Sequence, residues 1–242
     1  MSINESDTVA TNAAVGYPVR PQGSRKSMVD EAYRRIKKRI LTLEYPGGFQ
    51  ALEEDLAIQL GMSRTPVREA LIRLENEGFV EVVPRRGMRV RPLSVQDITE
   101  IYEVLTYLEV AAVEMLARRR LRAHELVRLE KAVGRMDKAL AAEDLAEWGE
   151  ADTEFHRLLV ELCGNSRLAR VALNFQEQGV RIRMVTLPLR SRPVYSNVNH
   201  AAVIEAVRRG DPETAREIHL ATTRRWGREM ADLLERHRIR EV

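Results

Sequence analysis

Cysteine and aromatic residues are scarce in this sequence of 242 residues, and both shortages narrow the classes of protein to which it can belong. A single cysteine, Cys163, excludes an intramolecular disulfide framework, which suits a reducing cytoplasm. Cys163 lies among apolar residues in "LLVELCGN", a setting that favours a buried small hydrophobe over a nucleophile. Aromatic residues make up 5% of the chain and charged residues 31%, a composition typical of a soluble and mainly helical protein.

Long apolar runs and common catalytic motifs are also missing. No run approaches the roughly 18 apolar residues needed to span a bilayer, so we expect no membrane partner. The opening "MSINESDTVA" carries acidic residues and no apolar block, unlike a secretory signal, and we expect a cytoplasmic location. The sequence contains no HExxH pair, no Gly-rich phosphate loop and no Gly-x-Ser-x-Gly elbow, which argues against several classes of enzyme.

The net charge of +3 is unevenly distributed along the chain. Residues 25–93 hold 14 Lys/Arg and 10 Asp/Glu, a net charge of +4, whereas residues 94–242 hold 24 of each. The first 24 residues contribute −1. Charged faces are usually only solvated, so this excess alone is weak evidence for an acidic partner.

Hydrophobic periodicity divides the chain into three parts. Residues 1–27 are polar, without periodicity, and are predicted to form a disordered tail. Residues 28–92 show three short helical patterns, ended by "EYPGG", Gly61 and Gly78, and then two alternating stretches around a Pro-Arg-Arg-Gly turn. This order of three helices and a hairpin predicts a winged helix-turn-helix.

Residues 93–242 show no further strand signal and predict an all-helical domain. Ser94 and Asp97 are spaced as a capping pair at the start of a long helix. Further helices are expected at about 123–141, 143–163, 167–187, 195–209 and 212–237. We therefore predict a mainly α fold, in which an antiparallel bundle of roughly six helices follows the winged domain.

The third short helix, in "GMSRTPVREALIRLENEGFV", carries two arginines one turn apart at its start. In a winged helix-turn-helix this end enters the major groove of DNA. There Arg64 and Arg68 can each reach a guanine edge through two parallel hydrogen bonds. Thr65 and the exposed N–H groups of the helix start suit phosphate oxygens.

The predicted hairpin tip adds a second group of candidates. Arg85 and Arg86 can approach the DNA backbone or the minor groove, and Gly87 allows the chain to come close. The alternative is that all these arginines only solvate one face of a small helical domain. The short turn between the helices, the basic hairpin and the segregated charge together favour DNA binding.

The stretch "LEEDLAIQLGMSRTPVREALIRLENEGFVEVVPRRGMRV" resembles the DNA-binding domain of the GntR family of bacterial transcription regulators. The helical remainder resembles the FadR-like (FCD) branch, whose bundle binds ligands and dimerises. The resemblance implies base contacts from Arg64 and Arg68, a phosphate contact from Thr65 and a wing tip at Gly87. It implies a nucleoid-associated homodimer on a pseudo-palindromic operator of double-stranded DNA, most often a repressor, controlled by a small-molecule effector.

A candidate metal site lies in "EADTEFHRLLVELCGN", where Asp152 and His156 stand four residues apart on one helical face. His200 and His219 could add ligands from other helices. The alternative is an ordinary carboxylate–histidine ion pair. The resemblance implies one divalent ion of the Zn, Ni or Mn class per subunit, held by an aspartate and three histidines. Its last histidine position falls on Thr222, and His219 lies one turn earlier, about 4.5 Å along the helix axis.

The effector site also departs from the family pattern. Many relatives carry an arginine in a stretch resembling "YEVRxxLE", and here the same stretch is "YEVLTYLE", with Leu105 at that position. Arg181 and Arg183 remain as candidates for binding an organic acid, the alternative for each being a solvated or ion-paired surface. Two rival functions stay open: a metal-dependent enzyme built on the bundle, and a bundle that only dimerises.

Overall fold

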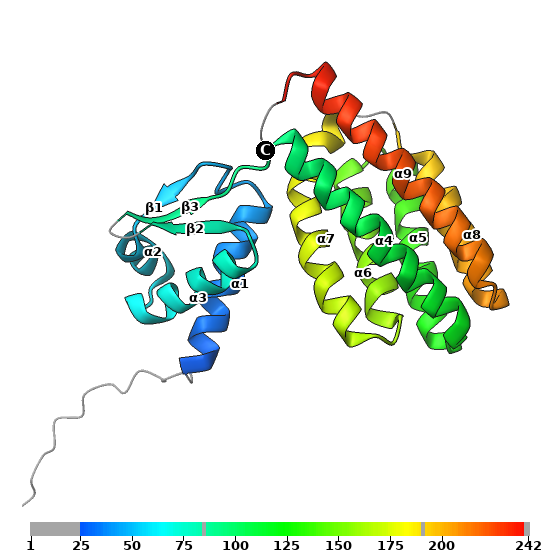
Figure 1. The fold of residues 1–242 in the computed structure, drawn as a ribbon, viewed down its shortest axis with the longest axis horizontal. Helices are drawn as coiled ribbons and strands as arrows, with labels where there is room; N and C mark the ends of the chain where they lie inside the picture. The colour runs from blue at the N-terminus through cyan, green and yellow to red at the C-terminus, as the bar shows by residue number, and fades with distance from the viewer. Residues whose placement is uncertain (1–24, 84–85, 190–191, 240–242) are drawn as a thin grey trace, which may run out of the picture.

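The computed structural model describes residues 25–83, 86–189 and 192–239, and these form two lobes side by side (Figure 1). The smaller lobe holds three helices and a sheet, and the larger is a bundle of helices. The predicted tail up to residue 24 and the candidate Arg85 lie outside the described residues. The mainly α fold predicted from the sequence is confirmed.

The smaller lobe begins with α1 (Arg25–Leu41), three residues before the predicted start. It continues through β1 (Gln50–Ala51), α2 (Glu53–Leu60), α3 (Arg64–Asn76), β2 (Val80–Val83) and β3 (Gly87–Val90). The strands form an antiparallel sheet in the order β1-β3-β2. The predicted hairpin is β2 and β3. The pairing of β1 was not predicted, because two residues cannot show a strand-like alternation.

Apolar residues on one face of α3 fix this helix on the lobe. Val67, Ala70, Leu71 and Leu74 are all 0% exposed, as the sequence pattern predicts. Full burial of one such Val or Leu stabilises a fold by roughly 1.5–3 kcal/mol. Gly61 ends α2 with a φ of 68°, a left-handed conformation that glycine adopts without strain. Only three residues separate α2 from α3. The exposed start of α3 lies close to Glu53, at the start of α2.

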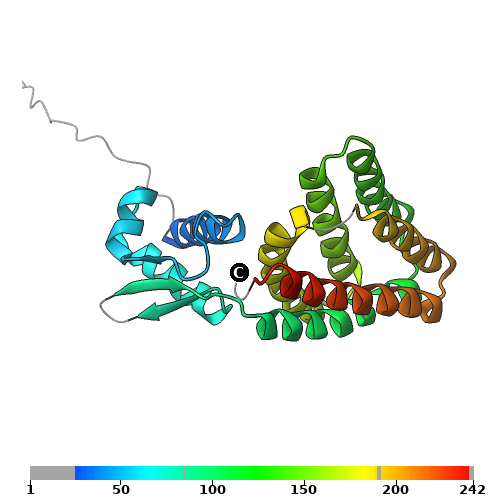
Figure 2. The ribbon, with the colours of Figure 1, turned by 90° about the horizontal axis from the view of Figure 1, so that it is seen from above.

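The larger lobe follows the predicted helices closely. It consists of α4 (Val95–Arg119), α5 (Ala123–Ala141), α6 (Leu145–Leu162), α7 (Ser166–Thr186), a 3-10 turn (Leu187–Leu189), α8 (Val194–Arg209) and α9 (Pro212–Arg236). Ser94 and Asp97 form the predicted capping box at the start of α4. Both views show α4 and α9 side by side (Figures 1 and 2).

The bundle core is built mainly from aliphatic residues with a few large aromatics. Trp148 and Phe155 of α6 are 0% exposed, and the Trp148 indole donates a hydrogen bond to Asn197 of α8. Cys163 is buried in this core, as expected for a small hydrophobe. Among the described residues, none of the helices combines the length and apolar character needed to cross a membrane.

Helix α7 of the bundle contacts α1 of the smaller lobe (Figure 1). The Lys37 ammonium of α1 donates to Tyr33 (2.5 Å), to Glu77 (2.7 Å) and to Glu177 of α7 (2.5 Å). Lys37 is only 6% exposed, because the neighbouring lobe covers this side of α1. Gln178 adds a hydrogen bond to the Glu77 carbonyl.

Candidate functional site

The first candidate site is the exposed start of α3. The side chains of Arg64 and Arg68 are 66% and 70% exposed, and Thr65 is exposed between them. Ser63 occupies the N-cap position but makes no side-chain cap hydrogen bond. The first N–H groups of the helix therefore remain available to an anion, and the helix dipole favours one there. Two guanidinium groups, a hydroxyl and a helix start thus face solvent together.

Glu53 at the start of α2 is a neighbour that the sequence reasoning missed. Its carboxylate lies 3.8 Å from the Arg64 guanidinium and 3.9 Å from that of Arg68. Exposed ion pairs at such distances contribute roughly 0–1 kcal/mol, so they yield readily to a stronger partner. Because nothing in "LEEDLAIQLG" shows which acid faces α3, only the packing of α2 against α3 identifies Glu53.

The hairpin presents one of its two candidate arginines among the described residues. Arg86 is exposed beside the turn. Gly87 is buried with a φ of 78°, and a Cβ there would lie 2.1 Å from the Ala51 carbonyl oxygen. The close approach of β1 therefore requires glycine at this position, whether or not DNA is bound. The sequence offered only the approach to DNA as a reason, because β1 was not predicted.

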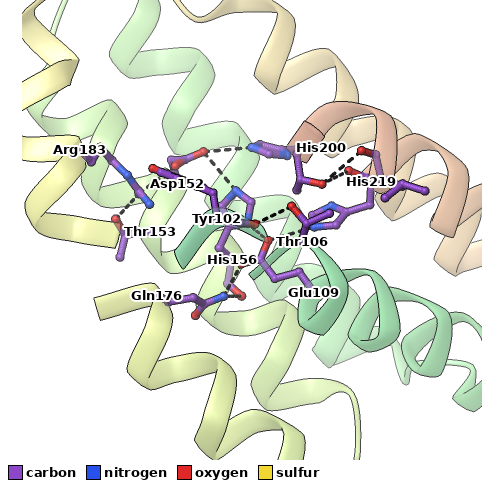
Figure 3. A network of polar contacts seen from close by, with 12 residues as sticks. Tyr102, Thr106, Glu109, Asp152, Thr153, His156, Gln176, Arg183, His200 and His219 are labelled. Atoms are coloured by element: carbon purple, nitrogen blue, oxygen red, sulfur yellow. Dashed lines mark hydrogen bonds and ion pairs between the residues drawn. The ribbon is translucent and has the colours of Figure 1, made fainter. Parts of the chain in front are cut away.

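The second candidate site is a buried polar cluster inside the bundle (Figure 3). It gathers Glu109 of α4, Asp152 and His156 of α6, His200 of α8 and His219 of α9. His200 Nε2 lies 3.0 Å and His156 Nε2 3.7 Å from Asp152 Oδ1. His156 Nδ1 and His219 Nε2 each lie 3.0 Å from Glu109 Oε2. The structure thus brings three of the four predicted metal ligands, Asp152, His156 and His200, into one group. It places His219 in a second group with His156 and Glu109, a glutamate that the sequence reasoning missed.

Burial and charge oppose each other in this cluster. Burial would raise the pKa of Asp152, but the charges of Arg183 and of His156 outweigh it and the pKa falls below its usual value. Burial would also raise the pKa of Glu109, and His156 lowers it to well below the usual range. Burial lowers the pKa of His200. For His156, the charges of Glu109 and Asp152 overcome burial and raise the pKa. At neutral pH both carboxylates are therefore ionised and the His200 ring is neutral.

One carboxylate and two imidazoles form a donor set that fits a divalent ion of the Zn, Ni or Mn class. Ligand distances near 2.1 Å place neighbouring donors of one ion about 3.0–3.4 Å apart, and the two distances from Asp152 Oδ1 span this range. His200 Nδ1 is buried and has no hydrogen-bond partner. To bind an ion through Nε2, the neutral His200 ring must carry its proton on Nδ1. Since Nδ1 accepts no hydrogen bond, it can take up this proton without losing a partner.

Helix α9 presents a different face to the cluster than the family pattern implies. His219 is 1% exposed and its Nε2 meets Glu109. Thr223, one turn on, lines a cavity that Glu109 and His156 also line, whereas Thr222 lines a neighbouring pocket between α8 and α9. His219 and His156 gather around Glu109, and His200 and His156 gather around Asp152. The two groups share His156.

The two candidate effector arginines lie in different places. Arg183 donates to Asp152 (2.9 Å) and to the Thr153 hydroxyl (2.5 Å) at the edge of the cluster. Arg181 is 0% exposed and donates to the Arg91 carbonyl at the junction of the lobes. Burial lowers the pKa of Arg181 to about 10. Arg183 is thus ion-paired, as its alternative allows, although it is mostly buried, and Arg181 lies in the interior and not on the surface.

A cavity of about 50 Å³ adjoins the cluster. Its lining includes Leu105, Thr106, Gln176, Arg183 and Trp226. A buried water needs about 10–15 Å³ of such space, so the cavity as it stands has room for an ion with a few waters and for little more. Binding of an organic acid therefore requires the surrounding helices to move apart.

Comparisons with known proteins agree with this architecture. Residues 28–90 match the family described as bacterial regulatory proteins, gntR family, and residues 100–237 match the FCD domain. An HTH-type transcriptional regulator from the TAR-I ttuE-ttuC' intergenic region of Agrobacterium vitis is 43% identical over 139 residues, 57% of this chain and 81% of that protein. The "Probable D-xylose utilization operon transcriptional repressor" of Paenarthrobacter nicotinovorans is 31% identical, over 70% of this chain and 74% of its own. The structure of Escherichia coli McbR/YncC, 21% identical, aligns with a TM-score of 0.72 over 87% of this chain and 98% of its own, a likeness of fold.

Proposed function

The chain belongs to the GntR family of bacterial regulatory proteins and carries an FCD domain, and from this premise we propose that it is a repressor whose hold on DNA is set by a small molecule. Membership makes it a DNA-binding transcription regulator. The domain division follows the same premise: residues 28–92 bind DNA, and residues 93–242 bind the effector and dimerise. Repression is supported by the name of the Paenarthrobacter nicotinovorans relative.

One observation carries the DNA-binding assignment. Arg64 and Arg68 project from the uncapped start of α3 with about two thirds of each side chain exposed, and their one charged neighbour within 4 Å among the described residues is Glu53. Each can form two parallel hydrogen bonds to a guanine. Thr65 and the first N–H groups of α3 suit the adjacent phosphates, and Arg86 extends the contact along the backbone.

A homodimer explains how such a short reading helix acquires specificity. Two copies related by a two-fold axis place two α3 helices on half-sites about one turn of DNA apart. The operator is then a pseudo-palindrome. Selection of bound fragments from random DNA tests this directly: we expect guanine-containing inverted repeats, and recovery of fragments without a shared sequence would contradict it.

The effector site is proposed at the buried cluster of the bundle. Asp152, His156 and His200 would hold the ion, and the ion would supply a positive centre for an acidic ligand. Arg183 offers a second cation beside it, and Thr153 a hydroxyl. These groups suit a small organic acid, with Arg183 as the cation that binds it in place of the arginine that the family pattern has where this chain has Leu105.

Helix α7 offers a route from this site to the DNA-binding lobe. On one side Gln176 donates to Glu109 (2.6 Å) and Arg183 holds Asp152. On the other, Glu177 binds Lys37 of α1. A ligand that opens the cavity must displace α7 or its neighbours, and the two lobes then change their relative position. Differential affinity for the two arrangements couples effector to operator.

The rival function, a metal-dependent enzyme, needs an open position on the ion beside a general base. Apart from the proposed ligand Asp152, Glu109 is the carboxylate that contacts His156, and three donors already occupy its oxygens. Incubating the protein with Zn²⁺ and a panel of organic acids separates the two functions. A shift in operator affinity without turnover supports the sensor, and product formation supports the enzyme.

A further inference from the structure

Glu109 is the one member of the polar cluster that neither the family pattern nor the predicted ligand set includes. It is 4% exposed in the middle of α4. Gln176 donates to its Oε1 (2.6 Å), and His156 and His219 both meet its Oε2 at 3.0 Å. A buried carboxylate is costly unless hydrogen bonds or opposite charges compensate it. Three donors from three different helices provide that compensation here.

His156 lies between the two carboxylates and turns one ring nitrogen to each (Figure 3). Its Nδ1 faces Glu109, and its Nε2 faces Asp152 Oδ1 at 3.7 Å. Both carboxylates offer only acceptors, but only Nδ1 is within hydrogen-bond distance of one, so the single proton of the neutral ring belongs on Nδ1. The lone pair on Nε2 then points to the side of Asp152 and His200. A hydrogen bond from a ligating histidine to a carboxylate is the usual way in which proteins orient a metal ligand.

We propose that Glu109 is a positioning residue: it fixes the ring orientation and tautomer of His156 for an ion held by Asp152, His156 and His200. Gln176 and His219 hold Glu109 in turn. His219 therefore acts on the ligand His156 through two hydrogen bonds, by way of Glu109, and is not the fourth ligand of the ion. The inference rests on the proposed metal site.

A competing arrangement is an ion at Glu109, His156 and His219, whose donor atoms also lie close together. The two nitrogens of His156 favour the first arrangement. His156 Nδ1 is hydrogen-bonded to Glu109 at 3.0 Å, so an ion between them would have to break that bond. His156 Nε2 lies 3.7 Å from Asp152 Oδ1, beyond hydrogen-bond distance, so an ion there breaks no hydrogen bond of His156.

The test uses the full-length protein, freed of metal with a chelator and titrated with Co²⁺, whose visible spectrum reports the ligands. We expect Glu109→Gln to weaken Co²⁺ affinity by about 10–100-fold while the spectrum at saturation keeps its band positions, because the ligands are unchanged. Asp152→Asn should alter the spectrum as well as the affinity. Glu103→Gln, an exposed glutamate on the same helix, is the matched control and should change neither.

Several results would overturn the inference. Unchanged affinity in Glu109→Gln removes the positioning role, and a changed spectrum makes Glu109 a ligand. Co²⁺ binding that survives His200→Gln but not His219→Gln places the ion in the other group. If the parent protein binds no Co²⁺, the inference falls, and the DNA-binding function is judged separately by operator binding of the same preparation.

A second variant keeps the test valid if Glu109→Gln does not fold. Gln176→Met removes a donor to Glu109 and leaves all four candidate ligands in place. We expect it to weaken Co²⁺ affinity several-fold with an unchanged spectrum. Unchanged affinity in this variant would also count against the proposal.

Discussion

Substituting Gly87 by alanine should unfold the hairpin side of the DNA-binding lobe even in the absence of DNA. The φ of Gly87 is 78°, and an added Cβ would lie 2.1 Å from the Ala51 carbonyl oxygen and 2.7 Å from the Leu52 Cα. Both atoms belong to backbone, so neither can turn aside as a flexible side chain would. Strand β1 would have to leave β3, to which it pairs through Gln50 and Ala51.

The magnitude follows from two contributions. Holding a residue other than glycine in the left-handed region costs about 1–2 kcal/mol. Loss of the short β1–β3 pairing adds about 2 kcal/mol, if two hydrogen bonds contribute about 1 kcal/mol each. We therefore expect Gly87→Ala to lower the free energy of unfolding of this lobe by about 3–4 kcal/mol. Gly61→Ala is the matched control, since Gly61 has a φ of 68° but no atom within 4 Å of the added Cβ; only the first cost applies to it.

Hydrogen exchange in urea, followed on peptides that cover β3, measures both variants without DNA. The reasoning is refuted if Gly87→Ala is no less stable than Gly61→Ala. If Gly87→Ala is stable and yet fails to bind an operator, the glycine serves the approach to DNA instead of the approach of β1.

Three further predictions concern other parts of the molecule. A double-mutant cycle of Lys37→Met and Glu177→Gln, read by thermal denaturation, should give a coupling energy of about 1 kcal/mol, and additive effects would contradict the described contact between the lobes. Glu125→Gln should lower the melting temperature at pH 7. A hydrogen bond from the Arg122 backbone lowers the pKa of Glu125 to about 2 in the folded state. The ionised carboxylate therefore stabilises the fold above about pH 4.5, and this stabilisation is lost as the pH falls towards 2. The difference in melting temperature between parent and variant should vanish at low pH. A difference that stays constant with pH would contradict stabilisation by the ionised carboxylate. Arg183→Gln removes a cation 2.9 Å from Asp152 and should tighten Co²⁺ binding several-fold, whereas weaker binding would show that Arg183 supports the site by another means.

Much of the fold was predictable because local signals agreed with the packing. The face of α3 that carries Val67 and Leu71 repeats at helical spacing, and the structure buries that face completely. Ser94 and Asp97 mark the start of α4 because a capping box is made within four residues. Such features depend on near neighbours in the chain, so the sequence alone displays them.

The features that were missed depend on which elements meet. In the sequence, Lys37 cannot be told from the other basic residues of its helix, and its burial depends on residues distant in the chain, Glu77 and, on α7, Glu177. Leu52 matches the spacing of Leu56 and Leu60, yet it stands at the N-cap of α2 and is 47% exposed. Glu109 lies in an ordinary amphipathic pattern, and its three donors come from residues 47, 67 and 110 positions away. No local signal could identify these partners.

The most direct test of the central claim is a titration of a selected operator fragment with three forms of the protein, followed by fluorescence anisotropy at several salt concentrations. Arg68→Ala should bind more weakly by about 1–3 kcal/mol, or roughly 5–150-fold, and should discriminate less at one guanine of each half-site. Arg118→Ala is the matched control on the bundle: Arg118 is 65% exposed and lies 3.8 Å from Glu114, much as Arg68 lies near Glu53. The account predicts parent-like binding by Arg118→Ala and the stated loss by Arg68→Ala; equal affinity and selectivity in all three forms would contradict it.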